Sequence, residues 1–177
     1  MTFVDQLFFS GADINLSGPH SWKPIHAATY NEFKKLTEML AEKGANLSAQ
    51  CRDIKNYSPL HILISTDKPP LELVELLIKK RAPLDIQHES GGTPLHLAAF
   101  WGHEAVTKVL LEAGAKTEIK NDKGRTALDV AALYGHKGVA EMIAKKSGQP
   151  VPKLKEKKKK TTSMKAPVEP PNPEKKN

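Results

Sequence analysis

Apolar side chains recur along the middle of this chain at the three- and four-residue spacing of a buried helix face. The positions that carry the pattern are Leu36, Leu40, Leu73, Val74, Leu77, Val106, Val109, Leu110, Val139, Met142 and Ile143. Gly44 and Gly114 follow two of these segments, and each begins a Gly-Ala pair. Glycine suits a helix end in the left-handed conformation because it has no Cβ to clash. The pattern predicts a series of helices separated by tight turns.

A short motif precedes each of these helical segments. Thr93 to Ala99 reads T-P-L-H-L-A-A, and related copies begin at Lys23, Ser58 and Thr126. Pro94 fits the first turn of a helix, where the backbone N–H needs no partner. The motif therefore predicts a first helix ahead of each apolar segment, and so a row of helix pairs.

The spacing of the copies also locates two insertions. One adds two residues near Asp67 to Pro70, and its two prolines assign it to the turn between helices. The other adds two residues between Gly44 and Pro59, in the loop around Cys51 to Ile54. Both insertions are predicted to lengthen loops and to leave the helices intact.

A T-P-L-H-x-A motif with a period of about 33 residues is the sequence mark of ankyrin repeats, and the chain resembles that family. The resemblance implies an all-α fold, a solenoid of stacked helix pairs with projecting finger loops. Residues 16–147 are interpreted as four ankyrin-type repeats. Residues 1–15 are interpreted as a half repeat, comprising a second helix and its exit turn, because Gly11 stands 33 residues before Gly44.

The net charge of +7 resides mainly in the last 30 residues. Residues 148–177 hold nine Lys and three Glu, which gives +6, together with six prolines and few apolar residues. Such a segment is expected to be disordered. Its lysine cluster suits a solubilising tail, a nuclear-import signal or a patch for nucleic acid or another acidic surface. The lysines of this cluster in the basic tail are Lys153, Lys155, Lys157, Lys158, Lys159 and Lys160.

Histidine and cysteine raise the question of a metal or catalytic site. His26, His61 and His96 share one repeat position, and His103 and His136 share another, so the repeat explains these five. The family resemblance implies that the first three order the turn. His20, His88 and Cys51 lie in separate loops without the spacing of a zinc site or a catalytic motif. We expect no catalytic, cofactor or metal site, and therefore no enzyme.

In ankyrin-like proteins, finger loops and the last turn of each first helix commonly bind partners. Those positions here hold all three tyrosines and both tryptophans. Tyr, Trp and Arg are enriched at interface hot spots. The expected partner-binding residues are Trp22, Tyr30, Tyr57, Phe100, Trp101, Arg125 and Tyr134.

Some of these aromatic side chains have an alternative role in packing. Phe100 and Tyr134 adjoin the alanines of their helices and would then support the neighbouring repeat. Trp22, Tyr57 and Trp101 are expected to bind a partner rather than to stabilise the fold.

The sequence therefore predicts a non-enzymatic adaptor that binds another protein through an aromatic-bearing concave face. The alternative is a structural subunit of a larger assembly, whose basic tail binds nucleic acid or a polyacidic protein segment. No apolar run approaches the length of a membrane span. One cysteine excludes an internal disulfide and is compatible with a reducing compartment, so we expect the cytoplasm or the nucleus.

Overall fold

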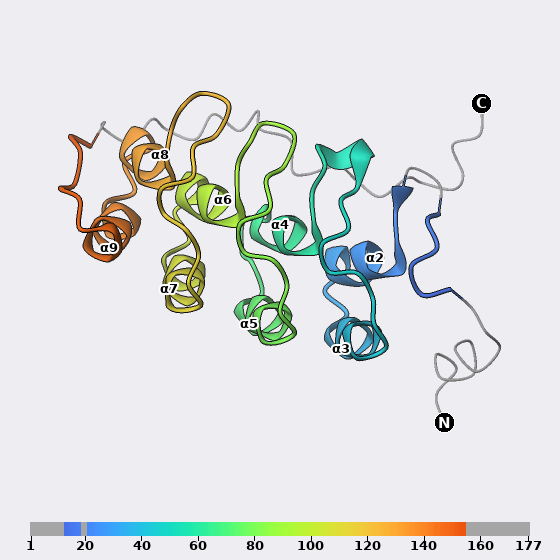
Figure 1. The fold of residues 1–177 in the computed structure, drawn as a ribbon. Coiled ribbons are helices and arrows are strands. Elements are labelled where there is room, and N and C mark those ends of the chain that lie inside the picture. Colours follow the sequence, from blue (N-terminus) through green and yellow to red (C-terminus); the bar gives the residue numbers. More distant parts are fainter. Residues whose placement is uncertain (1–12, 19–20, 155–177) are drawn as a thin grey trace.

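Two layers of short helices run side by side along the molecule in the computed structural model, which describes residues 13–18 and 21–154 (Figure 1). The first helices of the pairs form one layer and the second helices form the other, with the longer loops projecting beyond the first layer. The first helices are α2 (Pro24–Tyr30), α4 (Pro59–Ile64), α6 (Pro94–Trp101) and α8 (Ala127–Leu133). The second helices are α3 (Lys34–Glu42), α5 (Leu71–Lys79), α7 (Glu104–Glu112) and α9 (Lys137–Ser147). The prediction of an all-α solenoid of stacked helix pairs is confirmed.

The histidine of the Thr-Pro-Leu-His motif and its variants caps the start of α2, α4 and α6. In α6 the backbone N–H of Thr93 donates to Nδ1 of His96 at 3.2 Å. Nδ1 therefore accepts, and the proton lies on Nε2, which donates to the carbonyl of Arg125 in the following repeat at 3.0 Å. One imidazole thus caps its own helix and bonds to the next finger loop.

The histidines of the two preceding first helices also hydrogen-bond to the finger loop of the following repeat. His26 reaches the carbonyl of Ala49 at 2.9 Å, and His61 reaches that of Gly92 at 3.2 Å. The last first helix carries Asp129 instead, and its carboxylate accepts the N–H of Thr126 at 2.9 Å. An aspartate caps the helix equally well but has no proton to donate onward at neutral pH. The substitution fits the place where the row of helix pairs ends.

Both predicted insertions lie in loops. Helix α4 ends at Ile64 and α5 begins at Leu71, so Asp67 to Pro70 lie in the turn between them. The earlier insertion forms the short 3-10 helix η2 (Arg52–Ile54). An antiparallel bridge between Cys51 and Tyr57 closes the loop that contains η2. The helices keep their register because the additional residues project from the stack.

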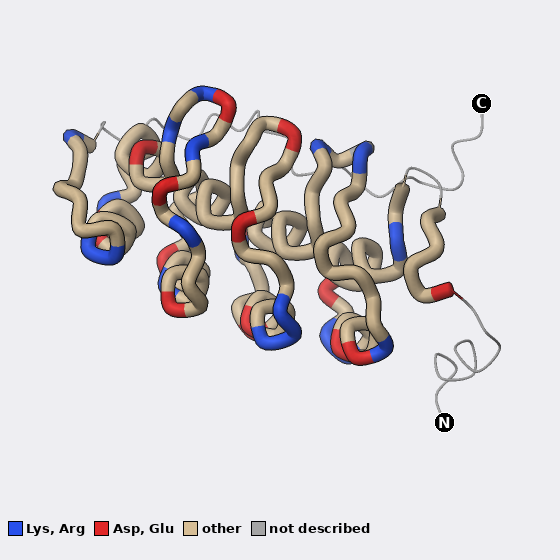
Figure 2. The backbone as a smooth tube through the Cα atoms, viewed as in Figure 1, with Lys and Arg blue, Asp and Glu red and all other residues tan. Residues whose placement is uncertain are grey.

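The core lies between the two layers and between successive pairs. Ile25, Leu60 and Leu95 hold the same position in three first helices, and each is fully buried. Ala98 and Ala99 are also fully buried, where their small side chains let helices approach closely. Charged residues of both signs lie along the second helices, whereas the first-helix layer is almost free of them (Figure 2).

Candidate functional site

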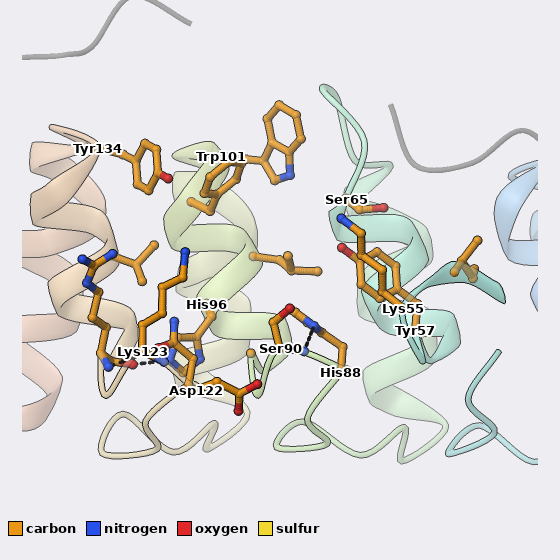
Figure 3. Close-up of a pocket in the computed structure, with 17 residues that line it drawn as sticks. Lys55, Tyr57, Ser65, His88, Ser90, His96, Trp101, Asp122, Lys123 and Tyr134 are labelled. Carbon is orange, nitrogen blue, oxygen red and sulfur yellow. Dashed lines mark hydrogen bonds between the residues drawn. The ribbon is translucent and has the colours of Figure 1, made fainter. Parts of the chain in front are cut away.

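A groove of about 690 Å³ lies between the finger loops and the first helices of the second, third and fourth pairs. Its wall on the loop side comes from the loops that precede α4, α6 and α8. The ends of α6 and α8 provide the helix side (Figure 3). The residues that line the groove include Lys55, Tyr57, His88, Trp101, Lys123 and Arg125, with Phe100 and Tyr134 beside Trp101.

Hydrogen bonds between the finger loops hold the loop wall together. The N–H of Glu89 donates to the carbonyl of Lys55 at 2.8 Å, and the N–H of Asp122 donates to that of Ser90 at 3.2 Å. Gly91 has φ +71°, and a Cβ there would come within 2.8 Å of the backbone nitrogen of Asp122. Glycine is therefore required where the third finger loop touches the fourth. The linked loops give the groove a preformed wall.

Three aromatic side chains gather at the helix side of the groove. The ring of Phe100 packs edge-on against Tyr134, with 4.5 Å between the centroids, and against Trp101, with 5.3 Å. Trp101 also stacks over His103 at 6.4 Å. All three aromatic side chains are partly exposed. In Figure 3, Trp101 and Tyr134 lie on the helix side of the groove, across from the finger-loop residues. Phe100 supports the cluster, and Trp101 and Tyr134 flank it.

Cationic side chains line the loop side. Lys55 comes from the loop before α4, and Lys123 and Arg125 come from the loop before α8. All three are exposed. Asp122 supplies the single carboxylate among the residues that line the groove in the described part of the chain. The groove therefore combines an aromatic side with a net positive side.

A family model described as "Ankyrin repeats (3 copies)" matches residues 1–88 and 64–153, and so most of the chain. The chain belongs to the ankyrin-repeat family. It is 30% identical over 105 residues to NF-kappa-B inhibitor alpha of Gallus gallus, an alignment that covers 53% of this chain and 32% of that protein. It is 38% identical over 96 residues to the ankyrin repeat domain-containing protein SOWAHD of Mus musculus, covering 52% and 28%. The chain thus spans about a third of the length of these relatives. Ankyrin repeats generally mediate protein–protein interaction.

Two of the aromatic residues predicted to bind a partner are buried in the ankyrin stack. Trp22 and Tyr57 are each only 8% exposed and belong to the hydrophobic core. Tyr57 stacks on His61 with 5.5 Å between ring centroids and lies 5.2 Å from His88. Their burial contradicts the expectation that they do not stabilise the fold, because neighbouring residues of the stack cover the bases of their loops.

The other predicted contact residues divide between the groove and the first repeat. Phe100, Trp101, Arg125 and Tyr134 line the groove and are at least partly exposed. Tyr30 is partly buried against Trp22, with 5.7 Å between ring centroids. Neither Tyr30 nor Trp22 lines the groove. The structure therefore brings four predicted residues together, of which Arg125 is exposed and the three aromatic residues are partly buried, and leaves the first repeat outside the site.

The sequence analysis left His88 unassigned, yet it lies at the centre of the groove wall. Its ring approaches those of Tyr57 and His61 at 5.2 and 5.4 Å, across two repeats. Its Nδ1 accepts the N–H of Ser90 at 3.1 Å. Burial, followed by the charge of Lys55, lowers the pKa of His88 to about 4. No local motif marks this histidine, since its neighbours come from residues about 30 positions earlier in the sequence.

His61, His103, His136 and Cys51 each have a structural role in the stack, whereas His20 lies outside the described residues. Burial lowers the pKa of His61 to about 3 and keeps the ring neutral. His103 and His136 bond through Nε2 to the carbonyls of Thr66 and Phe100 in the preceding repeat. Cys51 is fully buried, and desolvation raises the pKa of its thiol, which disfavours the nucleophilic thiolate. Among the described residues, no three His, Cys, Asp or Glu side chains are grouped to hold a metal ion.

The basic tail begins beyond α9. Lys153 is exposed, as are the apolar side chains of Val151 and Leu154 close to it. Lys155 and Lys157 to Lys160 lie outside the described residues. No helix among the residues that the structure describes is long and apolar enough to cross a membrane.

Proposed function

We propose that this ankyrin-repeat protein is a non-enzymatic adaptor and that a partner protein docks in the groove beside Trp101. The observation that carries the proposal is the aromatic cluster of Phe100, Trp101 and Tyr134, partly exposed at a preformed groove. Large amphipathic side chains of this kind dominate the energy of protein interfaces. The finger loops are already linked by hydrogen bonds, so binding orders little additional chain.

The size of the cluster suits an anchor within a larger contact. A fully exposed aromatic side chain can bury roughly 150–250 Å². Phe100, Trp101 and Tyr134 are already partly buried in the stack, so together they add much less than three times that area to an interface. A standard interface takes about 800 Å² from each partner. The finger loops must therefore contribute the remainder, which puts Lys55, Lys123 and Arg125 at the rim of the contact.

The second candidate function is that of a subunit that binds an acidic surface through its tail. The nine lysines of residues 148–177 favour it. Salt separates the two functions, because interactions between exposed charges weaken strongly as ionic strength rises. Docking on aromatic rings weakens much less. In both cases the expected locations are the cytoplasm and the nucleus, which microscopy of the tagged full chain tests.

Affinity capture with the full chain, followed by quantitative mass spectrometry, tests the adaptor proposal. We expect Trp101→Ala to lose the main partner, and Phe33→Ala to retain it. Phe33 is a matched control, since it is an aromatic residue that is 57% exposed and does not line the groove. A chain without residues 155–177 should also retain the partner at high salt.

The opposite result would favour the second function. In that case Trp101→Ala would still capture the partner, and the partner would be lost both on deletion of residues 155–177 and in high salt. Loss of the partner from Phe33→Ala as well as Trp101→Ala would place the interface over a wider surface than the groove.

A further inference from the structure

The charges that line the groove differ from those on the rest of the stack. On the second helices, lysines pair with glutamates of the neighbouring repeat, as in Lys34–Glu72 and Lys80–Glu42. Within the described part of the chain, the cationic groups of Lys55, Lys123 and Arg125 form no such ion pair. The second-helix face thus pairs some of its lysines with glutamates, whereas in the described part of the chain none of the three cations that line the groove is paired in this way.

The backbone around these cations has its own partners, which leaves the side chains available. The carbonyl of Lys55 accepts the N–H of Glu89, and the carbonyl of Arg125 accepts from His96. The N–H of Lys123 donates to the side chain of Asn121 at 3.0 Å. In Figure 3, Lys55 and Lys123 lie toward opposite ends of the groove, in different finger loops. The loops are therefore fixed by their backbones and present three cationic side chains to solvent.

His88 lies in the groove wall beside one of these cations, Lys55. The positive charge of Lys55 opposes protonation of this histidine more than the negative charge of Asp122 favours it. Among the described residues, three cationic side chains and one carboxylate line the groove, so the lining carries a net positive charge. A cationic segment, including the chain's own lysine-rich tail, would meet like charge there.

We propose that the groove takes an acidic segment of a partner protein, with an apolar or aromatic side chain seated against Trp101 and flanking carboxylates that meet Lys55, Lys123 and Arg125. This inference rests on the proposed function and specifies the chemistry of the partner. The aromatic contact supplies the anchor, and the charges select for acidic sequences and against basic ones.

Selection of random dodecapeptides displayed on phage, with the full chain immobilised at physiological salt, tests the inference. The wild type should enrich peptides that carry excess Asp and Glu around one large apolar residue. Lys55→Glu/Lys123→Glu/Arg125→Glu should lose that preference. The matched control is Lys35→Glu/Lys79→Glu/Lys145→Glu, which changes net charge equally on exposed second-helix sites and should keep it.

Affinities measured by fluorescence anisotropy with the most enriched synthetic peptide make the test quantitative. We expect a loss of tenfold or more for the groove triple variant, less than twofold for the control triple and about thirtyfold for Trp101→Ala. Lys55→Gln/Lys123→Gln/Arg125→Gln should give an intermediate loss. This glutamine variant also keeps the test valid if the glutamate triple variant fails to fold. Urea unfolding of each variant shows whether it is folded.

The outcomes separate this inference from the proposed function. Peptides without acidic excess, sensitive to Trp101→Ala and insensitive to the charge variants, would overturn the inference and leave the groove as the docking site. Acidic peptides that bind equally to all groove variants and are lost with residues 155–177 would assign the charge preference to the tail and contradict both proposals. Peptides insensitive to Trp101→Ala, to the charge variants and to the tail deletion would also contradict both.

Discussion

Tyr57 and Trp101 occupy positions that ankyrin-like proteins use for partner contacts, yet the structure gives them different surroundings. Tyr57 lies at the base of its finger loop between two histidine rings and is 8% exposed. Trp101 lies at the end of its helix, partly exposed, with Phe100 beneath its edge. The next repeat covers Tyr57, whereas Trp101 remains at the groove. The difference shows that packing between repeats decides which aromatic residues stay available for binding.

Tyr57 and Trp101 therefore have different roles in the same groove: Tyr57 stabilises the fold, and Trp101 is the proposed contact for a partner. Tyr57 and His88 form part of its wall and are held in place by the stack. Trp101, with the three cations, forms the part that meets solvent. Substitutions on the two sides should affect different measurements. Those of Tyr57 and His88 should change the stability of the fold, and that of Trp101 should change the affinity for a partner.

Tyr57→Ala should have the largest effect. Removing a buried aromatic ring leaves a cavity and costs about 3 kcal/mol or more of unfolding free energy. Urea unfolding followed by circular dichroism measures it, with Phe33→Ala as the exposed aromatic control. A loss below about 0.5 kcal/mol, which is typical of exposed sites, would show that Tyr57 does not belong to the core.

Acidification should destabilise the buried histidines that pack in the stack beside Tyr57. The pKa of His61 is about 3 in the folded protein, against about 6.5 when it is unfolded, so the unfolded chain binds more protons between these values. Stability is then fully present above pH 6.5 and falls as the pH drops toward 3. Between pH 7 and pH 5 this one histidine should cost about 2 kcal/mol.

Urea midpoints at pH 7 and pH 5 test this linkage. The folded pKa values of His26, His88 and His96 are also lowered, chiefly by burial, and add to the loss in the same direction. A midpoint that rises or stays constant on acidification to pH 5 would contradict the buried, neutral state of these rings.

Trp101→Ala should have the smallest effect on folding, below about 1 kcal/mol, because a partly exposed side chain leaves no closed cavity. Its effect on partner affinity should instead be about 2 kcal/mol, which is roughly thirtyfold. Paired urea and binding measurements on this single variant are needed. Destabilisation as large as that of Tyr57→Ala would erase the difference between the two residues.

Local patterns in the sequence predicted most of the fold. Pro94 begins its helix as the motif indicated, and Leu95 is fully buried. Gly44 and Gly114 have φ values of +90° and +93°, as their place after the helices suggested. These features depend on neighbours a few residues away, so the sequence displays them directly.

The candidate site was only partly predictable. Phe100, Trp101 and Tyr134 line the groove. The repeat frame selected them because each follows the alanines of a first helix at a fixed spacing, and their role in binding stays a prediction. The burial of Tyr57 was missed, since it depends on His88, 31 residues further along the chain. A two-residue insertion also reshapes that loop. Contacts between repeats leave no periodic signal in a single sequence.

The two tryptophans offer the most direct test of the central claim that a partner docks against Trp101. Trp22→Phe leaves Trp101 as the only tryptophan, and Trp101→Phe leaves only the buried Trp22. Acrylamide quenching should be strong for Trp101 and weak for Trp22 in the free proteins. Saturation with the captured partner should then protect Trp101 and shift its emission to shorter wavelength, while Trp22 stays unchanged. A partner that binds both variants fully and leaves Trp101 as accessible as before would contradict the account.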